Sequence, residues 1–485
     1  MSVTSADTVH PGGAQLITYA DRLAGDIPGL RRLLDEQLDG VFAGVHVLPF
    51  FVPIDGADAG FDPIDHSAVD PRVGTWDDIA ALAADHDVMA DLIVNHVSAE
   101  SELFLDWLAN GDDSAASGMF LTPERVFGHE PRPDELAAIH RPRPTSPFTE
   151  FTFADGRGRL VWTTFTDRQV DIDVEHELGW NHLLGILDRF HAGGVTIVRL
   201  DAVGYAIKRA GTSCFMLPET FDFIDRLTAA CRERNMRVLV EVHGHYRDQV
   251  ALAARVDLVY DFALPPLVLD ALYRGDATAL KQWIAIRPTN TVTVLDTHDG
   301  IGIVDVGGDP RDPRRAGLLS REQIHDLVEA IHGHSGGTSR SATGAAASNV
   351  DLYQVNSTFF DALGRDDDRY LAARTIQVLL PGIPQIYYVG LLAGINDMAL
   401  LESTGVGRDV NRHRYSADEV RTALARPVVQ RQVDVLRWRG TEPAFGGEFE
   451  LLDSADHLLV VRWQSTDSAF TASVDVRTGS TTIEH

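Results

Sequence analysis

The sequence predicts an α/β protein: a closed (β/α)8 TIM barrel with two loop insertions and a small C-terminal antiparallel β domain. First, eight short apolar segments alternate with helix-like segments along most of the 485 residues, a pattern typical of a parallel barrel. Second, two long stretches interrupt this alternation after the third and seventh strand segments. Third, the pattern after Arg439 changes to short alternating runs, which indicate antiparallel strands.

Each predicted barrel strand is a short run that is apolar on both faces, as suits a parallel strand covered by helices. Helices are predicted between the strands, for example at 30–38, 76–84 and 218–235, and Pro218 suits a first helical turn. The eight strands are predicted at 15–19, 44–48, 88–94, 195–201, 237–242, 258–262, 291–295 and 383–388.

The chain divides into barrel segments, two insertions and a C-terminal part. Both insertions follow the carboxyl ends of strands, where barrel enzymes carry their sites. Within the second insertion, residues 333–347 are rich in Gly, Ser, Thr and Ala and are predicted to form a mobile loop. The expected divisions are 1–96, 175–299 and 365–439 for the barrel, 97–174 and 300–364 for the insertions, and 440–485 for the β domain.

Composition excludes several classes of function. The formal net charge of −29 argues against nucleic acid or an anionic membrane as the main partner. The two cysteines, Cys214 and Cys231, form no Cys-x-x-Cys motif, so neither a disulfide framework nor a zinc ribbon is expected, and a reducing cytoplasm is the predicted location. No signal peptide is expected, and no apolar run is long enough to span a bilayer.

Ionisable residues stand at the ends of four predicted strands. Each alone has an ordinary explanation, such as a satisfied core histidine or a structural ion pair, but four on one rim of one barrel point to catalysis. Two carboxylates about 5–5.5 Å apart on neighbouring strands fit a retaining glycosidic mechanism. A metal site is the competing interpretation, which the nearby arginine disfavours. These residues are His96, Arg199, Asp201, Glu241, His298 and Asp299.

Four motifs resemble those of the α-amylase superfamily of retaining glycoside-active enzymes: DLIVNH (91–96), VRLDAVGY (198–205), EVH (241–243) and LDTHDG (295–300). The loops LPFFVPIDGADAGFDPIDH, GTSCF, YDFALPPL, ATGAAASN, DLYQVNST and GRDVNRH extend the similarity to the sucrose phosphorylase family along almost the whole chain. This resemblance implies reversible transfer of glucose from sucrose to inorganic phosphate, which gives α-glucose 1-phosphate and fructose. It also implies no metal or organic cofactor, and it suggests a homodimer.

The resemblance assigns a role to each matched residue. Asp201 would be the nucleophile that forms a covalent β-glucosyl ester, and Glu241 would be the acid/base. Asp299 would grip the glucose hydroxyls and stabilise the transition state, while Arg199 would keep Asp201 anionic. The implied glucose pocket consists of Asp58, Phe61, His96, Phe165, His298 and Arg408.

The second half of the implied site accepts both fructose and phosphate. Arg143 is the expected phosphate ligand, because a guanidinium matches phosphate oxygens. Asp351 would bind fructose hydroxyls instead, and the hypothesis is that the loop around 344–354 exchanges these two residues. The implied residues are Pro142, Arg143, Tyr205, Val242, His243, Asp351 and Gln354.

Acceptor preference stays open at this point. His140 stands where the family often has Tyr, close to the fructose side. Related phosphorylases that act on sucrose 6′-phosphate, glucosylglycerol or glucosylglycerate share the nucleophile and acid/base, and a retaining α-glucosidase is a further alternative. A catalytically inactive carbohydrate-binding barrel is disfavoured, because binding alone would not require Asp201, Glu241 and Asp299 together.

Overall fold

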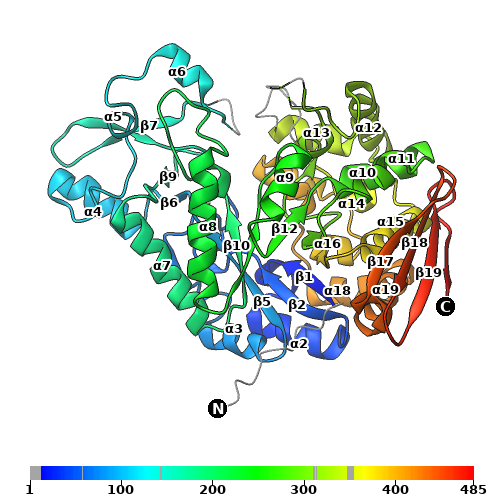
Figure 1. Cartoon of the computed structure of the whole chain (residues 1–485). Helices are drawn as coiled ribbons and strands as arrows, with labels where there is room; N and C mark the ends of the chain where they lie inside the picture. The colour runs from blue at the N-terminus through cyan, green and yellow to red at the C-terminus, as the bar shows by residue number, and fades with distance from the viewer. Residues whose placement is uncertain (1–12, 57, 142–144, 310–311, 313, 347–353) are drawn as a thin grey trace.

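A closed barrel of eight parallel strands forms the centre of the protein (Figure 1). The structure is a computed structural model that describes residues 13–485 except 57, 142–144, 310–311, 313 and 347–353. The strands are hydrogen-bonded in the closed order β1-β16-β13-β12-β11-β10-β5-β2, which confirms the predicted TIM barrel. Their bounds are β1 Ala14–Thr18, β2 Phe42–Val47, β5 Asp87–Ile93, β10 Ile197–Asp201, β11 Arg237–Val240, β12 Leu258–Asp261, β13 Thr291–Thr293 and β16 Ile383–Tyr387.

Helices surround the barrel, and several begin where the sequence supplies a cap. Asp26 accepts the N–H of Gly29 at the start of α2, and Thr75 forms a capping box with Asp78 at the start of α3. Pro218 occupies the first turn of α8. The surrounding helices are α1 Ala20–Leu23, α2 Ile27–Gln37, α3 Trp76–Ala83, α7 Glu177–Ala192, α8 Pro218–Arg232, α9 Tyr246–Ala253, α10 Leu264–Arg274, α11 Thr278–Ile284, α14 Phe359–Ala362, α15 Asp367–Leu379, α16 Tyr388–Leu391, α17 Met398–Thr404, α18 Ala417–Leu424 and α19 Pro427–Thr441.

The first insertion, between β5 and α7, is a lobe with its own apolar centre, at the upper left of Figure 1. Trp107 packs with its ring centroid 5.2 Å from that of Phe120 and 4.9 Å from that of Phe153, so the lobe is held by aromatic contacts. Its elements are β6 His96–Ser98, α4 Glu102–Asn110, η1 Gly111–Asp113, α5 Pro123–Phe127, α6 Pro133–Ala138, β7 Phe148–Thr152, β8 Gly158–Trp162 and β9 Gln169–Asp171.

The second insertion contains more regular structure than the sequence predicts. The prediction of a mobile loop over 333–347 is wrong for residues 333–334, which end helix α12, and for residues 338–346, which form helix α13 Thr338–Ala346, while residue 347 lies outside the described residues. Alanine is the strongest helix former, and the Ser339 hydroxyl lies 2.7 Å from both His332 Nδ1 and Ser335 Oγ, which ties α13 to α12. The other elements are β14 Ile301–Gly302, η3 Val304–Val306, α12 Arg321–His334 and β15 Gln354–Val355.

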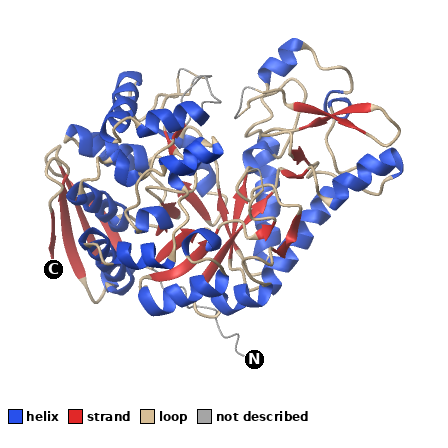
Figure 2. Ribbon diagram, turned by 180° about the vertical axis from the view of Figure 1, so that it is seen from behind, coloured by secondary structure: helices blue, strands red, loops and turns tan. Residues whose placement is uncertain are grey.

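The C-terminal part is the predicted antiparallel β domain, which the structure confirms. It packs against α19 through the rings of Trp438, Phe445, Trp463 and Phe470, whose contacting centroids lie 4.9–5.4 Å apart. Figure 2 shows this sheet as one outer layer of the molecule. Its elements are η5 Pro443–Gly446, β17 Glu448–Leu452, β18 Leu458–Gln464, β19 Ala469–Asp475 and β20 Thr481–Glu484.

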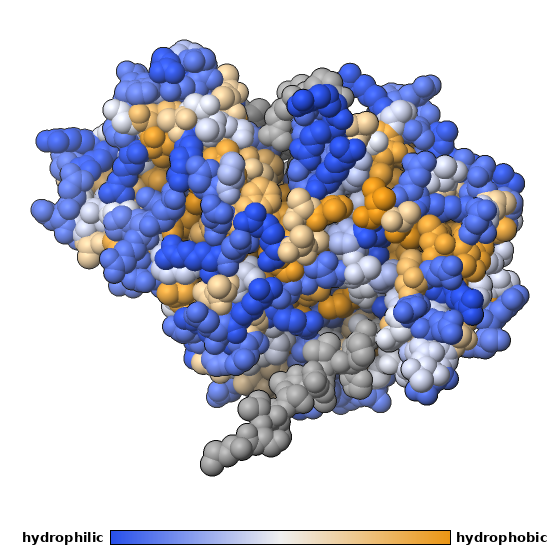
Figure 3. Space-filling model, viewed as in Figure 1, coloured by the Kyte–Doolittle hydropathy of each residue, from blue (hydrophilic) through white to orange (hydrophobic). Residues whose placement is uncertain are grey.

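Four short elements complete the part of the chain that the structure describes: β3 Phe51–Val52, β4 Asp65–Val69, η2 Val203–Tyr205 and η4 Gly407–Asn411. The face drawn in Figure 3 is mainly hydrophilic, with smaller hydrophobic areas between the hydrophilic ones. None of the described helices is both long enough and apolar enough to cross a membrane.

Candidate active site

The barrel brings Asp201 and Glu241 together at the carboxyl ends of two neighbouring strands. Leu200 of β10 pairs in register with Val240 of β11, so the next residue of each strand lies beside the other at the rim. The backbone N–H of Ala202 donates to Glu241 Oε2 at 3.4 Å. Ala202 has a φ of 55°, a conformation that is uncommon outside glycine and is often found at functional sites.

One buried arginine lies within ion-pair distance of three carboxylates beneath the rim. Arg199 Nη1 lies 2.6 Å from Asp91 Oδ1 and 2.8 Å from Asp201 Oδ1, and Nη2 lies 4.0 Å from Glu241 Oε2. Asp91 is held on its other oxygen by His46 Nε2 at 2.9 Å. Because one guanidinium neutralises several acids, the charges of Asp201 and Glu241 depend on each other.

The carboxyl groups of the site differ in how they hold a proton. Burial raises the pKa of Asp201 well above its usual value, Arg199 opposes this shift, and the charge of Glu241 adds to it. Burial also acts to raise the pKa of Asp299, but Arg408, His298, Arg412 and Arg199 together outweigh it and leave that pKa well below the usual range. Asp299 is therefore a fixed anion, whereas the charge on Asp201 responds to its neighbours.

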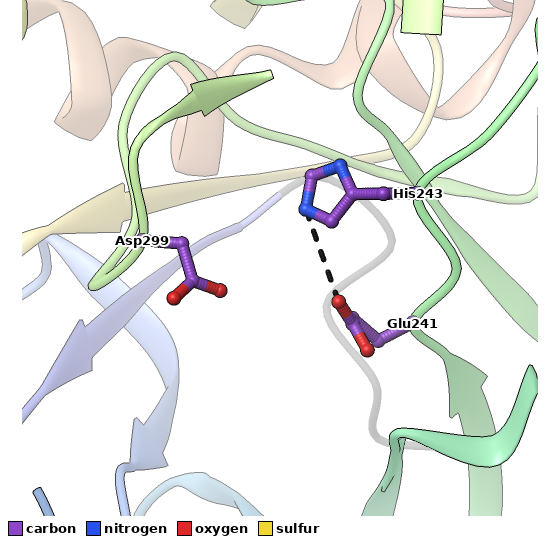
Figure 4. Close-up of side chains that lie close together, drawn as sticks. All are labelled: Glu241, His243 and Asp299. Atoms are coloured by element: carbon purple, nitrogen blue, oxygen red, sulfur yellow. Dashed lines mark ion pairs between the residues drawn. The ribbon is translucent and has the colours of Figure 1, made fainter. Parts of the chain in front are cut away.

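Glu241, His243 and Asp299 converge from two rim segments, with one atom of each within 4.8 Å of the others (Figure 4). His243 Nε2 lies 3.8 Å from Glu241 Oε1. Two carboxylates and an imidazole can bind a cation, but Arg408 Nη1 lies 2.7 Å from Asp299 Oδ1 and Arg199 lies beside Glu241. These guanidinium groups already balance the acids, so the geometry favours binding of polar ligands over binding of a metal.

Aromatic and imidazole rings line the predicted glucose side. The Phe61 ring stacks on His298 with centroids 4.9 Å apart, and the Phe165 ring lies 5.3 Å from His96. His96 Nε2 lies 3.0 Å from the Phe61 carbonyl oxygen. Burial lowers the pKa of His298 to about 3 and also lowers that of His96, so both rings are neutral near pH 7 and suit hydroxyl groups.

Asp58 and Arg408 complete this side of the site. Gln169, on β9 of the first insertion, places its Nε2 atom 3.1 Å from His96 Nε2 and 3.3 Å from Asp58 Oδ2. Arg408 reaches the same region through its ion pair with Asp299. The structure thus brings together all six predicted glucose-side residues. It adds Gln169, which no periodic pattern in the sequence indicates.

The predicted acceptor side is described in part. The Tyr205 ring lies 5.1 Å from Phe165 and 6.0 Å from His140. Gln354 places Nε2 3.3 Å from His243 Nε2, and its Oε1 accepts from Arg408 Nη2 at 3.3 Å. Val242, which stands between Glu241 and His243 in the sequence, is buried. The remaining predicted residues, Pro142, Arg143 and Asp351, lie outside the described residues.

A buried lysine that the sequence did not single out joins the first insertion to the barrel. Lys208 Nζ lies 2.7 Å from Asp171 Oδ2 on β9 and 2.8 Å from Asn95 Oδ1, and it also donates to the Tyr205 carbonyl oxygen. The Lys208 and Asp171 side chains are at most 2% exposed. Lys208 therefore holds both Tyr205 and Asn95, the residue before His96.

Replacement of Lys208 with Met is expected to lower the free energy of unfolding by about 3–5 kcal/mol, because it leaves the Asp171 carboxylate buried without this counter-charge. Urea or thermal unfolding measures the change. Lys281→Met is the matched control, since the Lys281 amine donates to the carbonyl oxygens of Ser454 and Ala455. Equal, small losses in the two variants would contradict a stabilising role for the Lys208 ion pair.

Comparison with known proteins identifies close relatives. The family description "Alpha amylase, catalytic domain" matches residues 7–271. The chain is 55% identical over 470 residues to a sucrose phosphorylase of Agrobacterium vitis, covering 97% of this chain and 96% of that protein. It is 51% identical over 466 residues to one of Bifidobacterium adolescentis, covering 96% and 92%. A crystal structure of sucrose 6F-phosphate phosphorylase from Thermoanaerobacter thermosaccharolyticum superposes with a TM-score of 0.90 and 37% identity, covering 99% and 96%.

Proposed function

The chain belongs to the alpha-amylase family, within the group that contains its sucrose phosphorylase relatives, and on this premise we propose that it is an enzyme for the reversible phosphorolysis of sucrose. It transfers the glucosyl unit to inorganic phosphate and releases fructose. The observation that carries the proposal is the rim of Asp201, Glu241 and Asp299 around Arg199 in a chain 55% and 51% identical to two sucrose phosphorylases.

The first half of the reaction breaks the glycosidic bond of sucrose. Asp201 attacks the anomeric carbon while Glu241 gives its proton to the departing fructosyl oxygen, which leaves a β-glucosyl ester on Asp201. Arg199 Nη1 lies 2.8 Å from Asp201 Oδ1, whereas Nη2 lies 4.0 Å from Glu241 Oε2, so the guanidinium stabilises a negative charge on Asp201 more directly than one on Glu241. The fixed negative charge of Asp299 stabilises the cationic character of the transition state.

The second half of the reaction transfers glucose to phosphate. Glu241 is ionised after it has given its proton to fructose. Esterification removes the charge of Asp201, so the negative charge on Glu241 is no longer opposed by that neighbour. Glu241 takes the proton of a phosphate hydroxyl, the phosphate oxygen attacks the anomeric carbon, and the bond to Asp201 breaks. Two inversions at one carbon retain its configuration, so the product is α-glucose 1-phosphate. Arg143 and Asp351 remain sequence predictions for phosphate and fructose.

Related specificities are the alternative function. Sucrose 6′-phosphate, glucosylglycerol and glucosylglycerate phosphorylases, or a retaining α-glucosidase, would use the same two carboxylates. Sucrose is favoured, because identity is 55% and 51% with the two sucrose phosphorylases and 37% with the sucrose 6F-phosphate phosphorylase.

Incubation of the purified protein with sucrose, with and without phosphate, tests the proposal. We expect phosphate-dependent release of fructose together with an equal amount of α-glucose 1-phosphate, measured by coupled assays or chromatography. Free glucose at the same rate without phosphate would instead identify a hydrolase. Turnover of only sucrose 6′-phosphate, glucosylglycerol or glucosylglycerate would identify a related phosphorylase, and no turnover with any of them would contradict the proposal.

The proposal also includes a reducing cytoplasm and a homodimer. Cys214 and Cys231 are both buried and neither forms a disulfide, which supports a reducing location. The net charge of −29 supports small-molecule partners over nucleic acid or an anionic membrane. Light scattering coupled to size-exclusion chromatography measures the oligomeric state.

A further inference from the structure

Asp305, in η3 of the second insertion, is fully buried beside His243. His243 Nδ1 donates to Asp305 Oδ2 at 2.9 Å, while the Gly244 N–H and Gln249 Nε2 donate to Oδ1 at 3.1 and 3.0 Å. Each of these partners donates, and an ionised carboxylate is an acceptor only. The contacts therefore match a charged Asp305 that holds the His243 ring by its Nδ1–H.

Two further contacts fix the orientation of this ring. The His243 imidazole stacks on Phe262 with centroids 3.9 Å apart. A Cβ atom on Gly302 would lie 2.3 Å from Asp305 Oδ2 and 3.2 Å from His243 Nδ1, so only glycine fits beneath the hydrogen bond. With Nδ1 held by Asp305, Nε2 faces Glu241 at 3.8 Å in the catalytic rim (Figure 4).

We infer that Asp305 is a positioning residue for the phosphate half of the reaction: it holds His243 so that Nε2–H donates a hydrogen bond to an oxygen of the incoming phosphate. This inference rests on the proposed function. Phosphate must enter beside Glu241 and Asp299, and it needs a positive donor there. Fructose is uncharged and has no such need, so the effect of Asp305 is specific to phosphate.

The charges around His243 agree with this role. Burial acts to lower the pKa of His243, but Asp305 first, and then Glu241 and Asp299, raise it above the usual value. The Gln354 amide nitrogen lies 3.3 Å from Nε2, while its Oε1 accepts from Arg408 Nη2 at 3.3 Å, so phosphate takes the place of this amide at the ring. His243 keeps its proton throughout, since the proton of phosphate goes to Glu241.

The variant Asp305→Asn tests the inference. We expect kcat/KM for phosphate to fall about 10- to 100-fold, the value of a charge-assisted hydrogen bond. The basic limb of its pH profile should move to lower pH, because the ring loses its proton earlier without the Asp305 charge. By contrast, kcat/KM for sucrose, measured from fructose release with water as acceptor, should stay close to that of the parent.

Two more variants complete the test. Gly302→Ala pushes the Asp305–His243 pair apart without changing charge and should reproduce the loss specific to phosphate. Asp397→Asn is the matched control, since Asp397 Oδ2 accepts from His413 Nδ1 at 2.6 Å in another Asp–His pair, and it should change neither substrate parameter.

Suppose that the parent phosphorolyses sucrose. Equal losses of kcat/KM for sucrose and phosphate in both Asp305→Asn and Gly302→Ala, or an unchanged kcat/KM for phosphate in both variants, would then overturn the inference alone. If the parent releases no fructose from sucrose, the proposed function fails as well, so the two failures are distinguishable.

Discussion

Replacement of Asp201 with Asn is expected to reduce kcat for sucrose phosphorolysis by about 10⁴-fold or more, comparable to the loss of a catalytic nucleophile in other enzymes. The amide keeps the size of the carboxylate and can still accept from Arg199 Nη1, which lies 2.8 Å from Asp201 Oδ1. It is, however, a very weak nucleophile. Fold should be retained, because the substitution conserves size and Arg199 keeps its ion pair with Asp91 at 2.6 Å.

Steady-state kinetics measures this loss, and intact mass spectrometry of acid-quenched samples provides a second readout. The parent should carry one glucosyl unit during turnover, and the variant none. Asp188→Asn is a matched control on the surface, where Asp188 pairs with Arg234 at 2.7 Å, and it should behave like the parent. If Asp201→Asn kept most of the turnover, Asp201 could not be the nucleophile.

Glu241→Gln is expected to lower kcat/KM for sucrose by about 10²- to 10⁴-fold, since proton transfer to the leaving oxygen is lost. The loss should depend on the leaving group. α-Glucosyl fluoride needs no proton to leave, so its kcat/KM should fall far less than that of sucrose. This contrast separates loss of the acid from general damage to the site, because Glu241 Oε2 also accepts from Ala202 N–H.

Stopped-flow or initial-rate measurements with both substrates test this contrast. Exposed Glu233, which follows α8, supplies the control variant Glu233→Gln, with no expected change for either substrate. Equal losses for sucrose and the fluoride would mean that Glu241 acts through binding or folding, not as the acid.

The barrel could be predicted because its signal is local. Each strand is a short apolar run. The carboxyl ends of all eight strands lie at one rim of the barrel. Asp201 and Glu241, at the ends of two neighbouring strands, could therefore be placed together from the sequence. Strand β20 was not predicted, because Thr481, Thr482 and Glu484 are polar and exposed and show no apolar alternation. These residues form a strand by pairing with β19.

Residues that lie in the insertions, or that reach the site by contacting them, could not be found in the same way. Gln169, Lys208 and Asp305 have no periodic pattern around them, and their partners His96, Asp171 and His243 are distant in sequence or lie across a loop. The path of a long connection depends on its own packing, such as the Trp107 cluster, and not on strand alternation. Helix α13 was missed for a related reason, since small residues suit both loops and helices.

The scarcity of lysine has a practical consequence for attachment of the protein to a support or a dye. Lys208 and Lys281 are the only lysines in the sequence, and the Lys208 amine is sequestered by Asp171, Asn95 and Tyr205. Among lysine side chains, amine-reactive esters should therefore couple at Lys281 alone. That position lies on α11 against the turn of Ser454 and Ala455, so conjugates made through lysine would share one defined orientation.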